Sequence, residues 1–366
     1  MKKTSAFFAI IFVCILKLSA QTYSFTFEGT ARKYIVHLPT GYNPANKFPL
    51  VLNLHGLGSY ASQQQLYSGM DATSDKYKFI VVYPDGVNNA WNVGIGLNAS
   101  INDVGYINAL LDTLIKKYAV NTGKIYSCGL SLGGYMTYKL GCELSQRFTA
   151  IASVSGVVSS GLNITCKPVK FLPLLHIHGT ADDVVAYGGS NGSLGAEASA
   201  KKWVGFDHCS NLADTTHVPD INKTDQSTAD LIKFQACSKG LDVWFYKIYN
   251  GGHTWPGAID IPNKVTNKDF NASDEIWKFF DRFPLIATGI TDDQSTKVEI
   301  IYPNPVNDNL YISGSSIQQV QILNLNGIIV QTGFTKENLL YVSSLQKGIY
   351  LLQTVGSKSV SRFIKE

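Results

Sequence analysis

The sequence has little net charge of either sign. Its 366 residues include 31 Lys and Arg against 27 Asp and Glu, which gives a formal charge of +4. Lys2, Lys3 and Lys17 lie in a segment that we expect to be removed, and without these three the charge is +1. A protein this close to neutrality has no broad electric field to attract nucleic acid or anionic lipid. The charge therefore predicts no nucleic-acid partner.

The apolar run near the N-terminus, residues 6–16, is too short to span a bilayer. Two lysines precede this run, and the small residues Ser19 and Ala20 follow it, which is the three-part layout of a secretory signal. We therefore expect a signal peptide over residues 1–20 and no stable membrane insertion. The mature protein is predicted to be secreted, either extracellular or at the cell surface.

Cysteine is scarce, at six residues, and one of the six lies in the predicted signal peptide. Outside the cytosol thiols tend to pair. Cys128 lies in an apolar, β-rich run and is expected to be a small buried residue. Neighbours in sequence, Cys142 with Cys166 and Cys209 with Cys237, would each close a modest loop. The spacing alone leaves the disulfide connectivity open.

Between residues 30 and 285, apolar β-branched runs alternate with helical patterns, which indicates an α/β fold with a mostly parallel sheet covered by helices. Helices are expected where apolar residues recur every three or four positions over 104–118, over 132–145, and over 273–283 with Ser273 as the N-cap. The expected strands are KYIVHL, FPLVLNLHG, KFIVVYP, GKIYSCGL, FTAIASVSG, FLPLLHIHG and DVWFYKIY.

The C-terminal part of the sequence has a different character. Residues 287–298 are polar and aperiodic, and we expect a linker there. From 299 to 366, short alternating segments are separated by Gly, Asn and Ser, which predicts a small all-β sandwich domain. The α/β catalytic domain is accordingly expected over residues 21–286.

A Gly-x-Ser-x-Gly pattern, from Gly129 to Gly133, follows an expected strand and opens an expected helix. At such a junction the serine is exposed on a sharp turn, and the glycines spare the turn Cβ clashes. Ester hydrolysis by an alcohol nucleophile needs a hydroxyl, a base, a group that orients the base, and oxyanion donors. We interpret Ser131 as this nucleophile.

The base and the acid follow the serine in the chain order of α/β-hydrolases, which leaves His208, His217 and His253 as bases. His253 lies in a glycine-flanked loop after the strand DVWFYKIY, and such sheets collect functional groups at the carboxyl ends of their strands. Asp182 and Asp183 follow the strand FLPLLHIHG, and only one of two adjacent side chains can face the histidine. The residues alone leave that choice open, and both aspartates could instead serve the turn.

Oxyanion donors are expected in two backbone N–H groups. Leu132 follows the serine at a helix N-terminus, and Leu57 lies in a glycine-rich loop that lets the backbone approach an intermediate. Aromatic residues near these motifs, His55, Trp91 and Trp255, are expected to line the substrate cleft, although packing is the commoner role of tryptophan.

The segments LVLNLHGLG, VVYPDGVNNAW, LLHIHGTADDVVAYGG and YNGGHTWPGA occur in this order. In the sequences of these segments and in their order, the chain resembles the poly(3-hydroxybutyrate) depolymerase and feruloyl-esterase-like family of secreted α/β-hydrolases over most of residues 30–285. In that family the serine of the Gly-x-Ser-x-Gly turn, the first aspartate after HGTA and the histidine of GGHTWPG form the catalytic triad. The resemblance therefore selects Asp182 over Asp183, and it implies that Cys209 and Cys237 pair near the active site.

The tail has a resemblance of its own. YPNPVNDNLYISG, NLNGIIVQ and LQKGIYLLQTVGSKSVSRFIKE are similar to the type IX secretion C-terminal sorting domain. Such domains carry a protein across the outer membrane, so the resemblance implies the secretion machinery as a partner.

Together these features predict an extracellular serine carboxylic-ester hydrolase that works through an acyl-enzyme on polymeric or oligomeric esters, without cofactor or metal. Plant-polysaccharide esters of feruloyl or acetyl type are the expected substrates, with poly(3-hydroxybutyrate) as the alternative. A metal hydrolase could use His176, His178 and Asp182, but no further His or Cys cluster completes such a site. A non-catalytic surface binding protein on a hydrolase fold is the alternative from another class.

Overall fold

The computed structural model describes residues 21–210, 212–283, 301–312, 319–324, 328–335, 338–354 and 360–366. The predicted signal peptide and linker lie outside these residues. Contacts divide the chain into two compact units, Met1–Ile286 and Ala287–Glu366, and each unit is described by itself. Among the described residues, none of the helices combines the length and apolar character that crossing a membrane requires.

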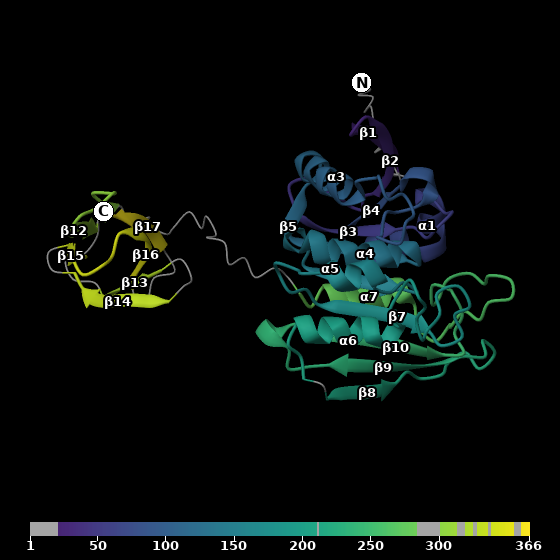
Figure 1. The fold of residues 1–366 in the computed structure, drawn as a ribbon. Coiled ribbons are helices and arrows are strands. Elements are labelled where there is room, and N and C mark those ends of the chain that lie inside the picture. The colour runs from purple at the N-terminus through teal and green to yellow at the C-terminus, as the bar shows by residue number, and fades with distance from the viewer. Residues whose placement is uncertain are drawn as a thin grey trace, which may run out of the picture. The chain divides into compact units, whose positions relative to one another are not determined.

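The described part of the first unit is built on a ten-stranded sheet in the order β1-β2-β4-β3-β5-β6-β7-β10-β9-β8 (Figure 1). The six central strands, from β4 to β10, run parallel, and the outer strands add in antiparallel fashion. The bounds are Gln21–Phe27 (β1), Thr30–His37 (β2), Phe48–Leu54 (β3), Ile80–Pro84 (β4), Val120–Leu130 (β5), Ala150–Val154 (β6), Leu174–Gly179 (β7), Ala213–His217 (β8), Thr228–Phe234 (β9) and Val243–Tyr249 (β10). The predicted α/β class and mostly parallel sheet are confirmed, and all seven expected strands are present.

Helices cover both faces of this sheet, which explains why its central strands are apolar on both sides. One face packs against α3 (Asp103–Lys117), α4 (Leu132–Glu143) and α6 (Ala196–Phe206) through side chains such as Leu111, Met136 and Trp203. The other face packs against α1 (Ala61–Ser68), α2 (Met70–Tyr77) and α7 (Ala272–Phe280). A short helix, α5 (Ser160–Thr165), follows β6.

The start of α7 corrects one expectation. Its N-cap is Asn271, whose side-chain oxygen accepts a hydrogen bond from the N–H of Asp274. Ser273 is fully buried, donates to the carbonyl of Ser68 at 2.7 Å and accepts from Trp255 at 3.1 Å. The predicted N-cap was wrong because Ser273 faces the core, whereas a capping side chain must turn back toward the helix end.

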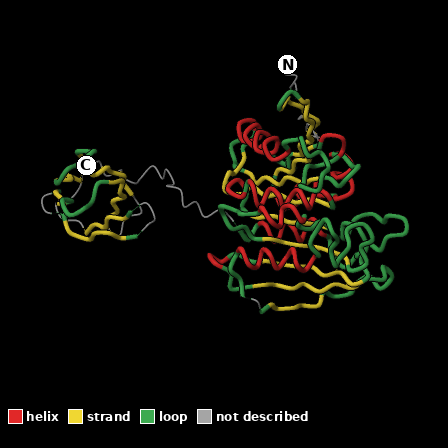
Figure 2. The backbone as a smooth tube through the Cα atoms, in the orientation of Figure 1, coloured by secondary structure: helices red, strands yellow, loops and turns green. Residues whose placement is uncertain are grey.

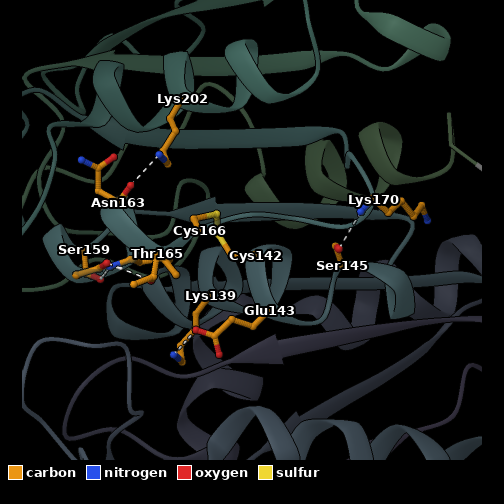
Figure 3. Close-up of a disulfide and its surroundings, with 12 residues drawn as sticks. Lys139, Cys142, Glu143, Ser145, Ser159, Asn163, Thr165, Cys166, Lys170 and Lys202 are labelled. Atoms are coloured by element: carbon orange, nitrogen blue, oxygen red, sulfur yellow. Dashed lines mark hydrogen bonds and ion pairs between the residues drawn. A yellow bond between two sulfur atoms is a disulfide. The ribbon is translucent and has the colours of Figure 1, made fainter.

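The disulfide connectivity that the spacing left open is Cys142–Cys166 and Cys209–Cys237, and Cys128 is a buried free thiol. Figure 3 shows the first bond joining the end of α4 to the chain after α5. The implied position of the second bond is wrong. Cys237 follows β9, whose end pairs with the start of β10, so the bond lies about 20 Å from the other end of β10, which leads to His253.

The described part of the second unit consists of two antiparallel sheets with the orders β11-β12-β15 and β14-β13-β16-β17. Their inward side chains share one core, in which Leu310 and Ile312 of the first sheet join Ile322 and Leu352 of the second. The predicted small all-β domain is confirmed. The strands are Ile301–Tyr302 (β11), Asn309–Ile312 (β12), Gln319–Leu323 (β13), Ile329–Phe334 (β14), Leu339–Tyr341 (β15), Gly348–Thr354 (β16) and Val360–Lys365 (β17).

Candidate active site

The carboxyl ends of the parallel strands collect the loops that carry the predicted site, at the edge where β7 and β10 end (Figure 2). Ser131 occupies the sharp turn between β5 and α4, with φ 56° and ψ −123°. These angles are strained for a residue that carries a Cβ, and such strain is typical of functional turns. A Cβ on Gly133 would lie 2.1 Å from the carbonyl oxygen of Leu54, so only glycine permits this approach of helix to strand.

The loop after β3 lies directly against Ser131. A Cβ built on Gly56 would be 3.2 Å from the Cβ of Ser131 and 3.7 Å from its Oγ. The next residue of this loop is Leu57, and its N–H, like that of Leu132, has no acceptor among the turn, loop and cap hydrogen bonds of the described residues. An N–H group of the residue after a serine and one from a loop that lies against it are suited to hold a developing oxyanion.

His253 and Asp182 are brought together from loops 71 positions apart in sequence. The Nδ1 of His253 donates to Oδ2 of Asp182 at 2.8 Å. The other carboxylate oxygen accepts from the N–H groups of Val184, at 3.0 Å, and Val185, at 2.8 Å. Burial of Asp182 works to raise its pKa, but the hydrogen bond and charge of His253 and the Val185 N–H outweigh burial, so the net pKa is lowered. The side chain is therefore a fixed, ionised acceptor.

Backbone contacts hold these two loops in register. The N–H of Thr180 donates to the carbonyl of Ile248, and that of Ala181 donates to the carbonyl of Gly251. Gly179 directly precedes Thr180, and a Cβ on it would come within 2.1 Å of the carbonyl oxygen of Gly251. The position of the histidine relative to the carboxylate is therefore set by main-chain packing.

Asp183 is placed differently from its neighbour. Its side chain is 62% exposed and pairs with the Nζ of Lys264 at 2.5 Å. The structure thus brings Asp182, and not Asp183, to the imidazole.

The three expected cleft residues, His55, Trp91 and Trp255, are all 0% exposed, which is a correction. The Nδ1 of His55 donates to the carbonyl of Gly56 at 2.8 Å, its Nε2 accepts from the N–H of Gly86 at 2.9 Å, and burial lowers its pKa. Trp91 donates to the carbonyl of His55 at 2.9 Å. Because side chains without exposed surface cannot meet a ligand from solvent, these residues do not line a cleft.

The two histidines of the metal alternative, His176 and His178, are buried structural groups. His176 contacts the hydroxyl of Tyr138 at 2.6 Å, and burial holds its pKa well below the usual range. The Nε2 of His178 is 3.9 Å from Oδ2 of Asp182, which is too long for a hydrogen bond. Within the ranges that the structure describes, no three His, Cys, Asp or Glu side chains are grouped so as to hold a metal ion.

Sequence reasoning missed the two main-chain groups that fix the carboxylate, the N–H groups of Val184 and Val185. Residue type does not reveal which main-chain N–H groups will donate to a side chain. The tendency of aspartate to occur in turns was the one weak indication of these hydrogen bonds.

The comparisons with known proteins identify the family. Residues 26–256 match the family model Esterase, described as "Putative esterase", which is more than half of the chain. The chain belongs to this esterase family. Residues 300–366 match the secretion system C-terminal sorting domain, so this esterase carries a domain for secretion, as predicted.

Relatives of this esterase include enzymes named acetylxylan esterase and feruloyl esterase. It is 28% identical over 269 residues to the bifunctional acetylxylan esterase/xylanase XynS20E of Neocallimastix patriciarum, covering 72% of this chain and 35% of that protein. It is 27% identical to feruloyl esterase D of Neurospora crassa, covering 72% and 87%. The chain thus spans only about a third of the length of the first relative. Poly(3-hydroxybutyrate) depolymerase is not specifically supported by these relatives.

A solved structure shares the fold. The acetyl xylan esterase from Aspergillus awamori superposes with a TM-score of 0.51 at 16% identity, over 71% of this chain and 99% of that one. At 16% identity the superposition shows a shared α/β-hydrolase fold.

Proposed function

We propose that this esterase cleaves carboxylic esters through a Ser131–His253–Asp182 triad and a covalent acyl-enzyme. Family membership gives ester hydrolysis as the class of activity. The observation that carries the proposed mechanism is the 2.8 Å hydrogen bond between His253 and the buried carboxylate of Asp182. It leaves Nε2 as the ring nitrogen that can accept a proton, because a carboxylate at Nδ1 accepts only.

In the first half-reaction the Oγ of Ser131 attacks the ester carbonyl as His253 takes its proton. The N–H groups of Leu57 and Leu132 hold the oxyanion, and His253 then protonates the leaving alcohol. In the second half-reaction water attacks the acyl-serine as the histidine accepts its proton, and the histidine then returns this proton to the Oγ of Ser131 as the acid is released. Asp182 stays ionised throughout and holds the imidazole in one tautomer.

The proposed substrates are esters of plant polysaccharides, of feruloyl or acetyl type. Support comes from the relatives named feruloyl and acetylxylan esterases. The loops at the proposed triad also present apolar side chains to solvent, with Leu57 58% and Val184 61% exposed. Apolar surface beside the nucleophile is suited to the acyl part of an ester.

A substrate panel tests this proposal. Purified wild-type protein and the Ser131→Ala variant are assayed on ethyl ferulate, acetylated xylan and hydroxybutyrate oligomers. We expect turnover of one or both plant-type esters, and loss of nearly all of it in the variant. Turnover of hydroxybutyrate oligomers alone would overturn the substrate assignment, and full activity of Ser131→Ala would overturn the mechanism.

A further inference from the structure

The carbonyl of Gly56 and the N–H of Leu57 are the two ends of one peptide unit. A peptide unit is planar and, at this position, trans, so its C=O and its N–H point in opposite directions. Gly56 lies directly against the proposed nucleophile, since a Cβ built on it would be 3.2 Å from the Cβ of Ser131. Any group that holds the carbonyl of Gly56 therefore also sets the direction of the Leu57 N–H beside Ser131.

Two N–H groups hold this carbonyl. The nearer belongs to the imidazole of His55, whose Nδ1 is 2.8 Å from the oxygen of Gly56. The backbone N–H of Ser59 donates to the same oxygen at 3.2 Å, which closes a turn within the loop. The bond from His55 is different in kind, because it ties the loop to a side chain that is 0% exposed. The ring is thus the closest fixed point for the peptide that carries the Leu57 N–H.

The contacts of the His55 ring leave it a single tautomer. Its Nε2 lies 2.9 Å from the backbone nitrogen of Gly86. A backbone N–H only donates and a carbonyl only accepts, so Nε2 is the acceptor and Nδ1 carries the proton. Burial lowers the pKa of His55 against the opposing charges of Asp85 and Asp103, which keeps the ring neutral. The ring is therefore a permanent donor to the carbonyl of Gly56.

The segment on the far side of the ring, which follows β4, is fixed in the core. The indole of Trp91 packs on the imidazole of His55 with ring centroids 4.9 Å apart, and its Nε1 donates to the His55 carbonyl at 2.9 Å. The N–H of Asn92, next in the chain, donates to the carboxylate of Asp103 at 2.7 Å. That carboxylate forms a buried ion pair with Arg32 at 2.6 Å. The ring therefore joins the loop after β3 to a part of the core that is itself held by charge.

The same contacts exclude a direct part for His55 in the chemistry. A side chain with no exposed surface cannot meet an ester that arrives from solvent. Its Nε2 is occupied by the N–H of Gly86, and its Nδ1 already carries a proton, so neither ring nitrogen can accept the proton of Ser131. The ring can affect catalysis only through the peptide that it holds.

We propose that His55 is a positioning residue for ester hydrolysis, which holds the carbonyl of Gly56 and so aims the N–H of Leu57 at the developing oxyanion. This inference rests on the proposed function, since it names what orients one of the proposed oxyanion donors. The same bond strengthens that donor, because linked hydrogen bonds polarise one another and the peptide N–H lies opposite the carbonyl that accepts.

Two amide variants separate the two hydrogen bonds of the ring. In His55→Asn the Nδ2 group takes the place of Nδ1 and can still donate to Gly56, while the bond from Gly86 is lost. In His55→Gln the Oε1 takes the place of Nε2 and can still accept from Gly86, while the bond to Gly56 is lost. Each variant loses one buried hydrogen bond, so the two are matched in structural cost and should lose similar amounts of Tm. They differ in whether the peptide of Leu57 is still held.

Steady-state kinetics of the full chain on ethyl ferulate give the first readout. In His55→Gln we expect kcat to fall about 10-fold, a part of the 10²–10³-fold that loss of a whole oxyanion donor costs, because the bond from Ser59 remains. In His55→Asn the loss should stay below about threefold, since the bond that aims the peptide is kept. KM should change little in either variant, because the oxyanion exists only beyond the ground state. Equal losses of kcat, or a change confined to KM, would overturn the proposal.

An inhibitor that mimics the intermediate gives the second readout. The Oγ of Ser131 adds to the carbonyl carbon of trifluoroacetophenone while His253 takes its proton, which leaves an oxyanion where the ester would form one. The Ki of this ketone should rise in His55→Gln by about the factor by which kcat/KM falls. It should stay close to the wild-type value in His55→Asn. A Ki that rises equally in both variants, or in neither, would contradict the positioning role.

Wild-type protein tests the proposal even where neither variant folds. In NMR of nitrogen-labelled protein, His55 should carry a proton on Nδ1 and none on Nε2. On addition of trifluoroacetophenone, the resonance of this ring proton should shift together with that of the Leu57 amide, because they act on the two ends of one peptide. A proton on Nε2, or a Leu57 amide that shifts alone, would overturn the role of His55. Wild-type protein that cleaves no ester would overturn the proposed function instead.

Discussion

The most informative perturbation is Asp182→Asn, because the geometry dictates how the amide must sit. The N–H groups of Val184 and Val185 both donate to Oδ1, so the amide oxygen has to stay there. The amide NH2 then replaces Oδ2 and faces Nδ1 of His253, 2.8 Å away. Since NH2 only donates, the ring must carry its proton on Nε2, and it can no longer accept the proton of Ser131.

The loss expected from this change of tautomer is about 10⁴-fold in kcat, on the order of 5 kcal/mol in activation free energy. Asp183→Asn is the matched control, since that side chain is exposed and pairs with Lys264, and we expect a change of less than about threefold. The assay is kcat on ethyl ferulate, with urea unfolding of each variant to show that the fold persists. Equal losses from the two variants, or a nearly active Asp182→Asn, would refute the reasoning.

The lowered pKa of Asp182 adds a pH dependence to this prediction. A carboxyl group whose folded pKa lies below its unfolded value stabilises the fold above the unfolded pKa, near 3.8, and loses this contribution as pH falls through the folded pKa. The free-energy difference between wild type and Asp182→Asn should therefore shrink on acidification below pH ~4. A difference that grows on acidification would contradict the assignment of an ionised Asp182.

Three further predictions concern the scaffold. Burial raises the pKa of Asp207 to about 8, above its ordinary 3.8, so the folded form keeps a proton that the unfolded chain has lost, and stability should fall as pH rises from ~4 to ~8. Urea unfolding should show that Asp207→Asn gains several kcal/mol of stability over wild type across this window, on the order of 1.4 kcal/mol per unit of pKa shift. A stability difference that does not change with pH would contradict this prediction. Replacing both Cys142 and Cys166 by Ser opens a loop of sequence separation 24 and should lower stability by about 3 kcal/mol, or roughly 6–12 °C in Tm, whereas an unchanged Tm would show that the bond contributes nothing. Gly133→Ala should abolish soluble folded protein or ester turnover, because its Cβ meets the Leu54 oxygen at 2.1 Å, while Gly205→Ala in α6, with open space around it, should be tolerated in the same expression and circular-dichroism test.

The central strands were predictable because they are buried on both faces and read as continuous apolar runs, as in β4 and β6. The edge strand β8 was missed, since its sequence ADTTH is exposed at every position and carries no apolar signal. Pairing with β9, and not burial, makes it a strand. The N-cap of α7 was missed because the side chain of Ser273 is buried and donates a hydrogen bond to the carbonyl of Ser68, so it is not available to cap the helix.

At the site, chain order and motif selected Ser131 and His253 as candidates, while the residues alone left two aspartates open. What separates the aspartates is one step along a turn, which turns the side chain of Asp182 inward and that of Asp183 to solvent. Such a step depends on main-chain contacts like that of Ala181 with Gly251, which residue type does not reveal. The prediction of the cleft residues was wrong for a similar reason, since proximity in sequence to a motif does not determine whether Trp91 or Trp255 faces solvent or the core.

The central claim is that the hydroxyl of Ser131 is made reactive by His253. A fluorophosphonate probe tests it directly, with peptide mapping by mass spectrometry on wild type and on His253→Ala. We expect a single adduct on Ser131 in wild type, formed at least ~10²-fold more slowly in the variant, since general-base assistance contributes about 10²–10⁴-fold. An adduct on another residue, or equal labelling rates in the two proteins, would contradict it.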